Sequence, residues 1–142
     1  MDDQVQSIRD NAHLGVGQLG PLSEIDFGFN RESVEWVDGY IERLRAHPDF
    51  DQDSLDGLVG VLGSFPGECV IAATGGVWQW SEEDHGWGVA LADNTYAFPF
   101  AKVRKQFENG AVDGNSILGF YRIGVDYIAL GKLPLADKPT RS

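Results

Sequence analysis

The chain has 142 residues, which suits a single domain that can bury a core without metal ions or disulfides. Its net charge of −11, from 22 acidic and 11 basic residues, repels phosphate backbones and argues against nucleic-acid binding. The chain has one cysteine, no basic-then-apolar leader and no uninterrupted apolar run of the roughly 20 residues that span a bilayer, so we expect a cytoplasmic protein that does not insert into membranes.

The charge is distributed unevenly. Residues 1–56 hold 13 acidic and 4 basic residues, whereas residues 57–142 hold 9 acidic and 7 basic residues. A solvated surface and a dedicated acidic docking face built from the N-terminal half both fit this distribution.

The N-terminal segment, residues 1–26, shows no sustained apolar period and contains "GVGQLGPLS". We expect an arm or loop there, then a single domain over 27–131 and a tail over 132–142. Gly15, Gly17 and Gly20 match the spacing of a dinucleotide-binding fingerprint. No strand-like segment precedes them, which favours a glycine-rich loop over a cofactor site.

Two helical patterns come next along the chain. The first begins after Asn30, a good capping residue, and has apolar positions at Val34, Val37, Ile41 and Leu44. The second begins near residue 53 or 54, and its apolar period continues past Pro66 to "TGG". One long helix kinked at the proline and two abutting helices both fit.

Strand-like alternation then takes over. "VWQWS" and "WGVALAD", separated by "EEDHG", predict a hairpin, "DNT" predicts a turn, and "YAFPF" predicts a short third strand. "PFAKVRKQFENG" and "NSILGFYRIGVDYIAL" predict two further helices. The predicted fold class is α+β, with N-terminal helices, a three-stranded antiparallel meander, and C-terminal helices packed on one face.

Glu68 and Cys69 are neighbours in an otherwise apolar run. Cys69 continues the apolar helical stripe, so we interpret it as a small buried residue and not as a nucleophile. A carboxylate beside such a stripe needs a hydrogen bond or an ion pair. We therefore expect Glu68 to tie the helix end to the hairpin. Its candidate partners are a backbone amide in "GGVW", a tryptophan indole, and a base such as Lys102 or Arg104.

The hairpin carries the candidate binding residues. These are three tryptophans and three acids: Trp78, Trp80, Trp87, Glu82, Glu83 and Asp84. Alternation places Trp78 and Trp80 on one face of their strand, either in the core or as an exposed platform for another protein. His85 follows the acids, where it is either part of a solvated turn or a catalytic base.

No metal ion or cofactor is expected. The three histidines and Cys69 share no zinc-ligand spacing. Asp49, Asp51 and Asp53 match the first ligand positions of a calcium loop, but the glycine and glutamate that the rest of the loop requires are missing. Helix capping explains these aspartates better.

Several segments together resemble a known group of domains. They are "LGSFPGE" leading into "GGVW", "FPFAKVRKQFENG" and "NSILGFYRI", within residues 55–123. They resemble small bacterial domains of uncharacterised function, some of them immunity-like or accessory proteins of toxin systems. The resemblance implies a compact α+β domain without established catalytic residues, in which Glu68 and the turn at Gly75 and Gly76 serve the architecture.

These observations together predict a non-catalytic protein-binding domain, an immunity or regulatory accessory protein that uses an acidic and aromatic surface. Its expected partner is another protein, with a basic surface as the best electrostatic match, and self-association is a further option. The alternative is a small hydrolase or ligand-binding enzyme with a Glu68/His85 pocket walled by the tryptophans.

Overall fold

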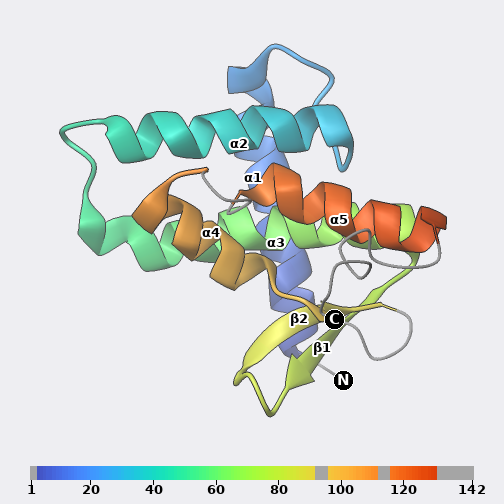
Figure 1. Ribbon diagram of the computed structural model, residues 1–142. Coiled ribbons are helices and arrows are strands. Elements are labelled where there is room, and N and C mark those ends of the chain that lie inside the picture. The colour runs from blue at the N-terminus through green and yellow to red at the C-terminus, as the bar shows by residue number, and fades with distance from the viewer. Residues whose placement is uncertain (1–2, 92–95, 112–115, 131–142) are drawn as a thin grey trace.

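The computed structural model describes residues 3–91, 96–111 and 116–130, with side chains as far as residue 126 (Figure 1). The elements follow in the order α1 (Asp3–Ser23), α2 (Arg31–Ala46), the 3-10 helix η1 (Gln52–Ser54), α3 (Leu55–Thr74), β1 (Val77–Ser81), β2 (Gly86–Ala90), β3 (Tyr96–Ala97), α4 (Pro99–Asn109) and α5 (Ile117–Leu130). The α+β fold class is confirmed: helices precede and follow a three-stranded antiparallel sheet of order β1-β2-β3.

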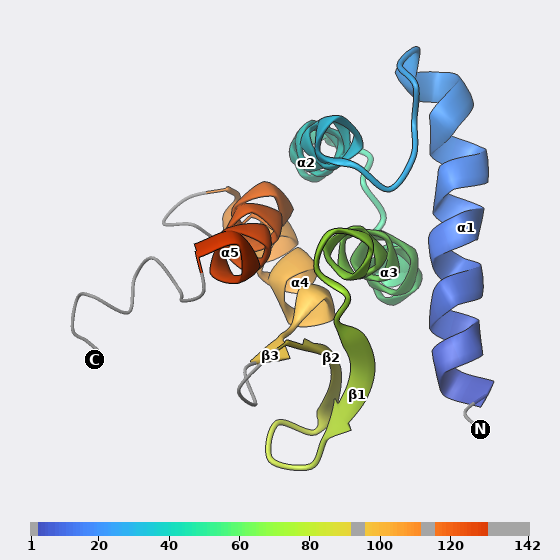
Figure 2. The ribbon, with the colours of Figure 1, turned by 90° about the vertical axis from the view of Figure 1, so that its right-hand side faces the viewer.

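Helix α3 lies at the centre of the molecule. Figure 2 shows it end-on, with α1 on one side, α4 and α5 on the other, and α2 above it. The small sheet lies at one end of this helical layer. Phe65, Cys69 and Val70 of α3 are fully buried, so this helix supplies the middle of the core.

The expected N-terminal arm is a helix. Residues Asp3–Ser23 form α1, which crosses α3 steeply and packs against it (Figure 1). Its buried positions include Ile8, Ala12, Gly15 and Leu19, which recur every three to four residues. The periodicity was hidden because two of these positions carry small residues. A Cβ on Gly15 would lie 3.2 Å from Val61 Cγ1, so the small residues allow the two helices to approach closely.

The predicted limits of α2 and α3 are confirmed. The Asn30 side chain accepts a hydrogen bond from the Ser33 amide at 2.9 Å and so caps α2. Helix α3 is one continuous helix that contains Pro66. It ends at Gly75, whose φ of +82° is the left-handed conformation that glycine adopts at helix ends.

The predicted hairpin is also confirmed. Strands β1 and β2 pair antiparallel, with Trp78 opposite Val89 and Trp80 opposite Trp87, so these four side chains share one face of the hairpin. Gly76 directly precedes β1 and lies close to β2. A Cβ on this residue would lie 2.9 Å from Val89 Cγ1. The predicted "DNT" turn and the tail over 132–142 lie outside the described residues.

The C-terminal helices begin and end close to their predicted limits. Pro99 opens α4, and Val103 and Phe107 on its inner face are buried. The Ser116 hydroxyl accepts a hydrogen bond from the Gly119 amide at 3.0 Å, at the start of α5.

The segment Gln52–Thr74, η1 with α3, is long and apolar enough to cross a membrane by length and composition alone. Glycines and a few polar residues interrupt its apolar residues, so the segment has no continuous apolar run, while its Leu, Val, Ile and Ala residues keep the average hydropathy high. Half of the most apolar 18-residue stretch of this segment is buried against other parts of the molecule, as in the core helix of a globular domain.

Candidate functional site

Glu68 joins three elements of the fold. Its Oε2 accepts a hydrogen bond from the Trp78 indole Nε1 at 2.7 Å, which connects α3 to β1. The Arg9 guanidinium of α1 lies 3.7 Å from the same oxygen. Of the partners expected for Glu68, the structure therefore shows a tryptophan indole, while the arginine comes from a helix that the sequence analysis did not expect.

The indole of Trp78 packs against α3 at Gly67, which has no side chain. A Cβ on Gly67 would lie 2.5 Å from Trp78 Cζ2, so only glycine leaves room for the ring there. Trp78 itself is 6% exposed. Its hydrogen bond to Glu68 therefore satisfies a polar group inside the core.

Cys69 lies on the buried side of α3 and is fully enclosed. Burial, with a further contribution from the charge of Glu68, raises the pKa of the Cys69 thiol well above its ordinary range. A thiol held in its protonated form is a poor nucleophile and a poor metal ligand. The position agrees with a packing role for this residue.

The outer end of the hairpin presents a pair of tryptophans. The rings of Trp80 and Trp87 meet edge to face, with their centroids 6.0 Å apart. Trp80 is 41% exposed, and its indole donates a hydrogen bond to Glu82 Oε2 at 3.1 Å. The Trp87 indole donates to Gln4 Oε1 of α1 at 3.0 Å, so α1 supports this end of the hairpin. We call Trp80, Trp87, Glu82, Glu83 and Asp84 the hairpin surface.

The turn between β1 and β2 carries the acids of this surface. Glu82, Glu83 and Asp84 are all exposed. The Ser81 hydroxyl donates to Asp84 Oδ2 at 2.9 Å and accepts from the Asp84 amide, which fixes the turn. His85 is exposed and has a φ of +52°, so it completes the tight turn in a left-handed conformation.

The structure places Glu68 and His85 in different environments. His85 lies at the edge of a cavity of about 690 Å³, and Glu68 is not among the described residues that line it. Trp78 and Trp80 do not line it either, and Trp87 is its only tryptophan within the described part of the chain. The carboxylate of Glu68 is held by Trp78 and Arg9 instead.

This cavity was not anticipated from the sequence. It lies between the hairpin, β3, α4 and α5, and its apolar walls include Leu91, Phe98, Phe100, Phe120 and Ile123. Lys102, Arg104 and Lys105 of α4 line it as well. Three cations beside one apolar hollow are unusual in a chain with twice as many acidic as basic residues.

The three cations differ in their surroundings. Arg104 Nη2 lies 2.7 Å from Asp56 Oδ1, so this guanidinium joins α4 to the start of α3. Within the described part of the chain, neither Lys102 nor Lys105 has a carboxylate within ion-pair distance. Burial, and then the positive charge of Lys105, lowers the pKa of Lys102.

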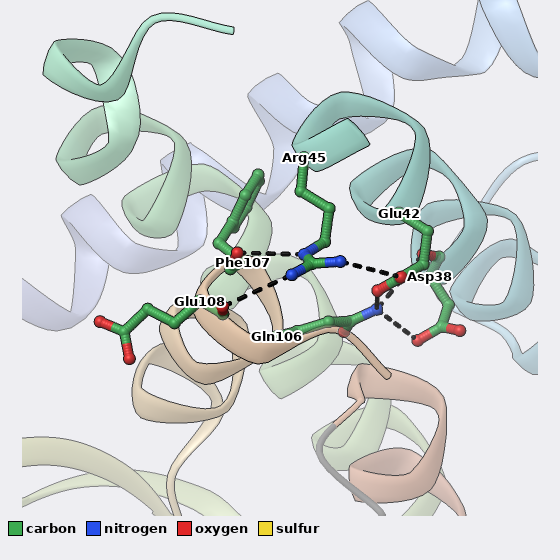
Figure 3. Close-up of polar contacts among 6 residues, drawn as sticks. All are labelled: Asp38, Glu42, Arg45, Gln106, Phe107 and Glu108. Carbon is green, nitrogen blue, oxygen red and sulfur yellow. Dashed lines mark hydrogen bonds and ion pairs between the residues drawn. The ribbon is translucent and has the colours of Figure 1, made fainter. Parts of the chain in front are cut away.

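A buried polar network holds the helices that form this cavity. Gln106 is fully buried, and its Nε2 donates to Asp38 Oδ1 at 3.1 Å and to Glu42 Oε2 at 3.0 Å (Figure 3). Its Oε1 accepts from the Ile117 amide at 2.9 Å, at the start of α5. A single side chain of α4 therefore links α2 to the start of α5. It satisfies the Ile117 amide, one of the first-turn amides that have no partner within their own helix.

Arg45 completes the network from α2. Its Nε donates to the Phe107 carbonyl at 3.1 Å, and Figure 3 shows its guanidinium reaching across the end of α4. A cation at a helix C-terminus satisfies free carbonyls and complements the helix dipole. Sequence reasoning missed the network because Asp38, Glu42 and Arg45 lie on the polar side of α2, where solvated residues are the ordinary expectation.

Residues 3–91, 96–111 and 116–126, whose side chains the structure describes, form no metal centre. Among the described side chains, no group of three or more His, Cys, Asp or Glu residues is placed to hold an ion. Asp51 caps η1 instead: its Oδ1 accepts from the Asp53 amide at 2.9 Å. Gly15 and Gly17 lie within α1, so the matching glycine spacing belongs to a helix and not to a phosphate-binding loop.

Comparison of the chain with protein families, with curated proteins and with solved structures finds no match. The resemblance to immunity-like and accessory domains therefore rests on the quoted sequence segments alone, and function must be argued from the geometry.

Proposed function

We propose that this chain is a non-catalytic domain that binds another protein through the hairpin surface, in an immunity or regulatory role. The observation that carries the proposal is the Trp80–Trp87 pair, because Trp80 is 41% exposed at the outer end of the hairpin while it remains fixed by Glu82. Rigid, half-exposed tryptophans are typical anchors of protein interfaces.

The charge around the pair indicates the kind of partner. Glu82, Glu83 and Asp84 are exposed beside it, and the whole chain carries a net charge of −11. Such a surface attracts a basic protein and accelerates its association. The partner we propose therefore presents an apolar pocket surrounded by lysine or arginine side chains.

The test begins with recovery of the partner and continues with its affinity. The wild-type protein is used as bait in a lysate, the recovered protein is purified, and binding is measured by calorimetry. Trp80→Ala is expected to weaken binding about thirtyfold, the effect of losing an interface anchor of about 2 kcal/mol. Replacing Glu82 and Glu83 by Gln is expected to slow association and to reduce the salt dependence of binding.

The matched control is Leu22→Ala. Leu22 is an apolar side chain that is 62% exposed on α1, outside the hairpin surface, so its loss should leave the affinity unchanged. A partner that binds Trp80→Ala as tightly as wild type refutes the proposed surface. Recovery of no protein partner, together with turnover of a metabolite by the purified domain, refutes the function. If the bait recovers only its own chain, gel filtration of wild type and Trp80→Ala decides whether the partner is a second copy.

A further inference from the structure

The cavity between the hairpin, β3, α4 and α5 has the size of a small-molecule site. Its volume of about 690 Å³ falls within the roughly 300–1,000 Å³ of known ligand pockets. Two of its walls are the helices α4 and α5, which the Gln106 network fixes to each other and to α2. A hollow with such fixed walls needs little reorganisation to accept a ligand.

The walls indicate an apolar ligand body. Phe98, Phe100 and Phe120 lie in three different parts of the lining, in the β3–α4 connection, α4 and α5. Aromatic and aliphatic side chains of this kind gain free energy when an acyl chain or a ring displaces water from their surfaces. A purely hydrophilic ligand would leave that surface without a matching partner.

The polar groups indicate the charge of the ligand. Lys102 and Lys105 lie one turn apart on α4 and both line the cavity. Their mutual repulsion and the partial burial of Lys102 disfavour its charged form, and an anion between them would relieve both effects. Arg104 is paired with Asp56, and the Asp84 carboxylate, which also lines the cavity, accepts a hydrogen bond from Ser81. Lys102 and Lys105 are therefore the cations of the described lining that have no carboxylate partner.

We infer that this cavity binds a small amphipathic monocarboxylate, with its carboxylate at Lys102 and Lys105 and its hydrocarbon body among Phe98, Phe100 and Phe120. The cavity shares Asp84 and Trp87 with the hairpin surface, but Trp80, Glu82 and Glu83, the residues replaced in the protein-binding test, do not line it. Either inference can fail without the other.

Calorimetry of the full chain with three ligands of equal chain length tests the charge selection: decanoate, decanol and decyltrimethylammonium. The two ionic ligands are used below their micelle concentrations and decanol below its solubility limit. Decanoate is expected to bind at one site per chain, and decanol about tenfold more weakly, because it lacks the charge-assisted contacts. The cation is the sharpest control. Nonspecific adsorption to a chain of net charge −11 favours a cation, whereas the proposed site rejects it.

Variants locate the site within the molecule. Lys102→Met and Lys105→Met are each expected to weaken decanoate binding about tenfold and to leave decanol binding unchanged. Ala101→Trp, at an exposed helical position of the lining, is expected to weaken both ligands at least about tenfold by filling the hollow. Arg122→Met removes one positive charge from the exposed side of α5, outside the described lining, and should change neither affinity.

Two further measurements keep the result interpretable. Thermal unfolding verifies that each variant is folded, and amide chemical shifts of the wild type are expected to change at Phe98–Lys105 and Phe120–Gly124 when decanoate is added. Absence of saturable decanoate binding to the folded wild type overturns the inference. Equal binding of the cation, or an equal loss in Arg122→Met and Lys102→Met, overturns it as well.

Discussion

Trp78 and Trp80 lie two residues apart on the same face of β1, and each donates its indole hydrogen to a glutamate. Trp78 is 6% exposed and bonds to Glu68 of the central helix, whereas Trp80 is 41% exposed and bonds to Glu82 of its own hairpin turn. The Trp78–Glu68 pair joins β1 to the central helix α3. The Trp80–Glu82 pair fixes a side chain that remains available to a partner.

The difference comes from what lies beneath each ring. Under Trp78, Gly67 leaves a gap in α3 that the indole fills, and Pro99 closes it from α4. The Trp80 ring meets Trp87 edge to face, and the Trp87 indole is in turn held by Gln4 of α1. The same residue type therefore serves the core at one end of a strand and the surface at the other.

The largest expected effect separates the two tryptophans directly. Trp78→Ala should lower the free energy of unfolding by about 3–5 kcal/mol, because it removes a buried ring and leaves Glu68 without its donor. Trp80→Ala should cost only about 1 kcal/mol, since it loses an edge-to-face contact at the surface. Urea unfolding of both variants measures the difference. Equal losses of unfolding free energy in the two variants would show that Trp78 and Trp80 contribute equally to stability, contrary to this prediction.

A substitution on α3 tests the gap beneath Trp78 without changing the tryptophan. Gly67→Ala should destabilise by about 1–3 kcal/mol, because the new methyl group overlaps the indole. The control is Gly17→Ala in α1, where a Cβ meets nothing within 4 Å. This control should stabilise by up to about 1 kcal/mol, through higher helix propensity. A neutral or stabilising Gly67→Ala would show that the ring can move away.

The smallest effect concerns Cys69 and appears only at alkaline pH. In the unfolded chain the thiol ionises above about pH 8.5, whereas burial raises the pKa of the native thiol and keeps it protonated. The native state then binds one proton more than the unfolded state, so the free energy of unfolding falls as pH rises, by up to about 1.4 kcal/mol per pH unit. This stability is fully present below about pH 8.5.

Comparison with Cys69→Ala isolates the thiol. The difference in unfolding free energy between wild type and variant is measured from pH 7.5 to pH 9.5, so that the contribution of Lys102, which is present in both proteins, cancels. A difference that stays constant with pH would mean that the native thiol ionises like that of the unfolded chain. A thiol reagent should also leave Cys69 unmodified in the native protein and modify it fully in denaturant.

Local chemistry made much of the fold predictable. Asn30 begins α2 through its capping side chain, and Gly75 ends α3 through its left-handed backbone conformation. Strict alternation places Trp78 and Trp80 together on one strand face. Helix α1 was missed because a stripe built from Ala12 and Gly15 looks like a loop until its partner helix is known. Small residues contribute to packing because they let two helices approach closely. A pattern of hydrophobic residues does not reveal this contribution.

The sequence by itself determined the class of the fold, the order of its elements from α2 onward and the need of Glu68 for a partner, because these follow from local periodicity and from the cost of burying a charge. Only the tertiary structure decided that this partner is Trp78, that Gln106 joins three helices, and that Lys102 and Lys105 meet an apolar hollow. The contacts of Glu68 and Gln106 join residues 10 to 68 positions apart, and their geometry depends on how whole helices pack, which no local pattern encodes.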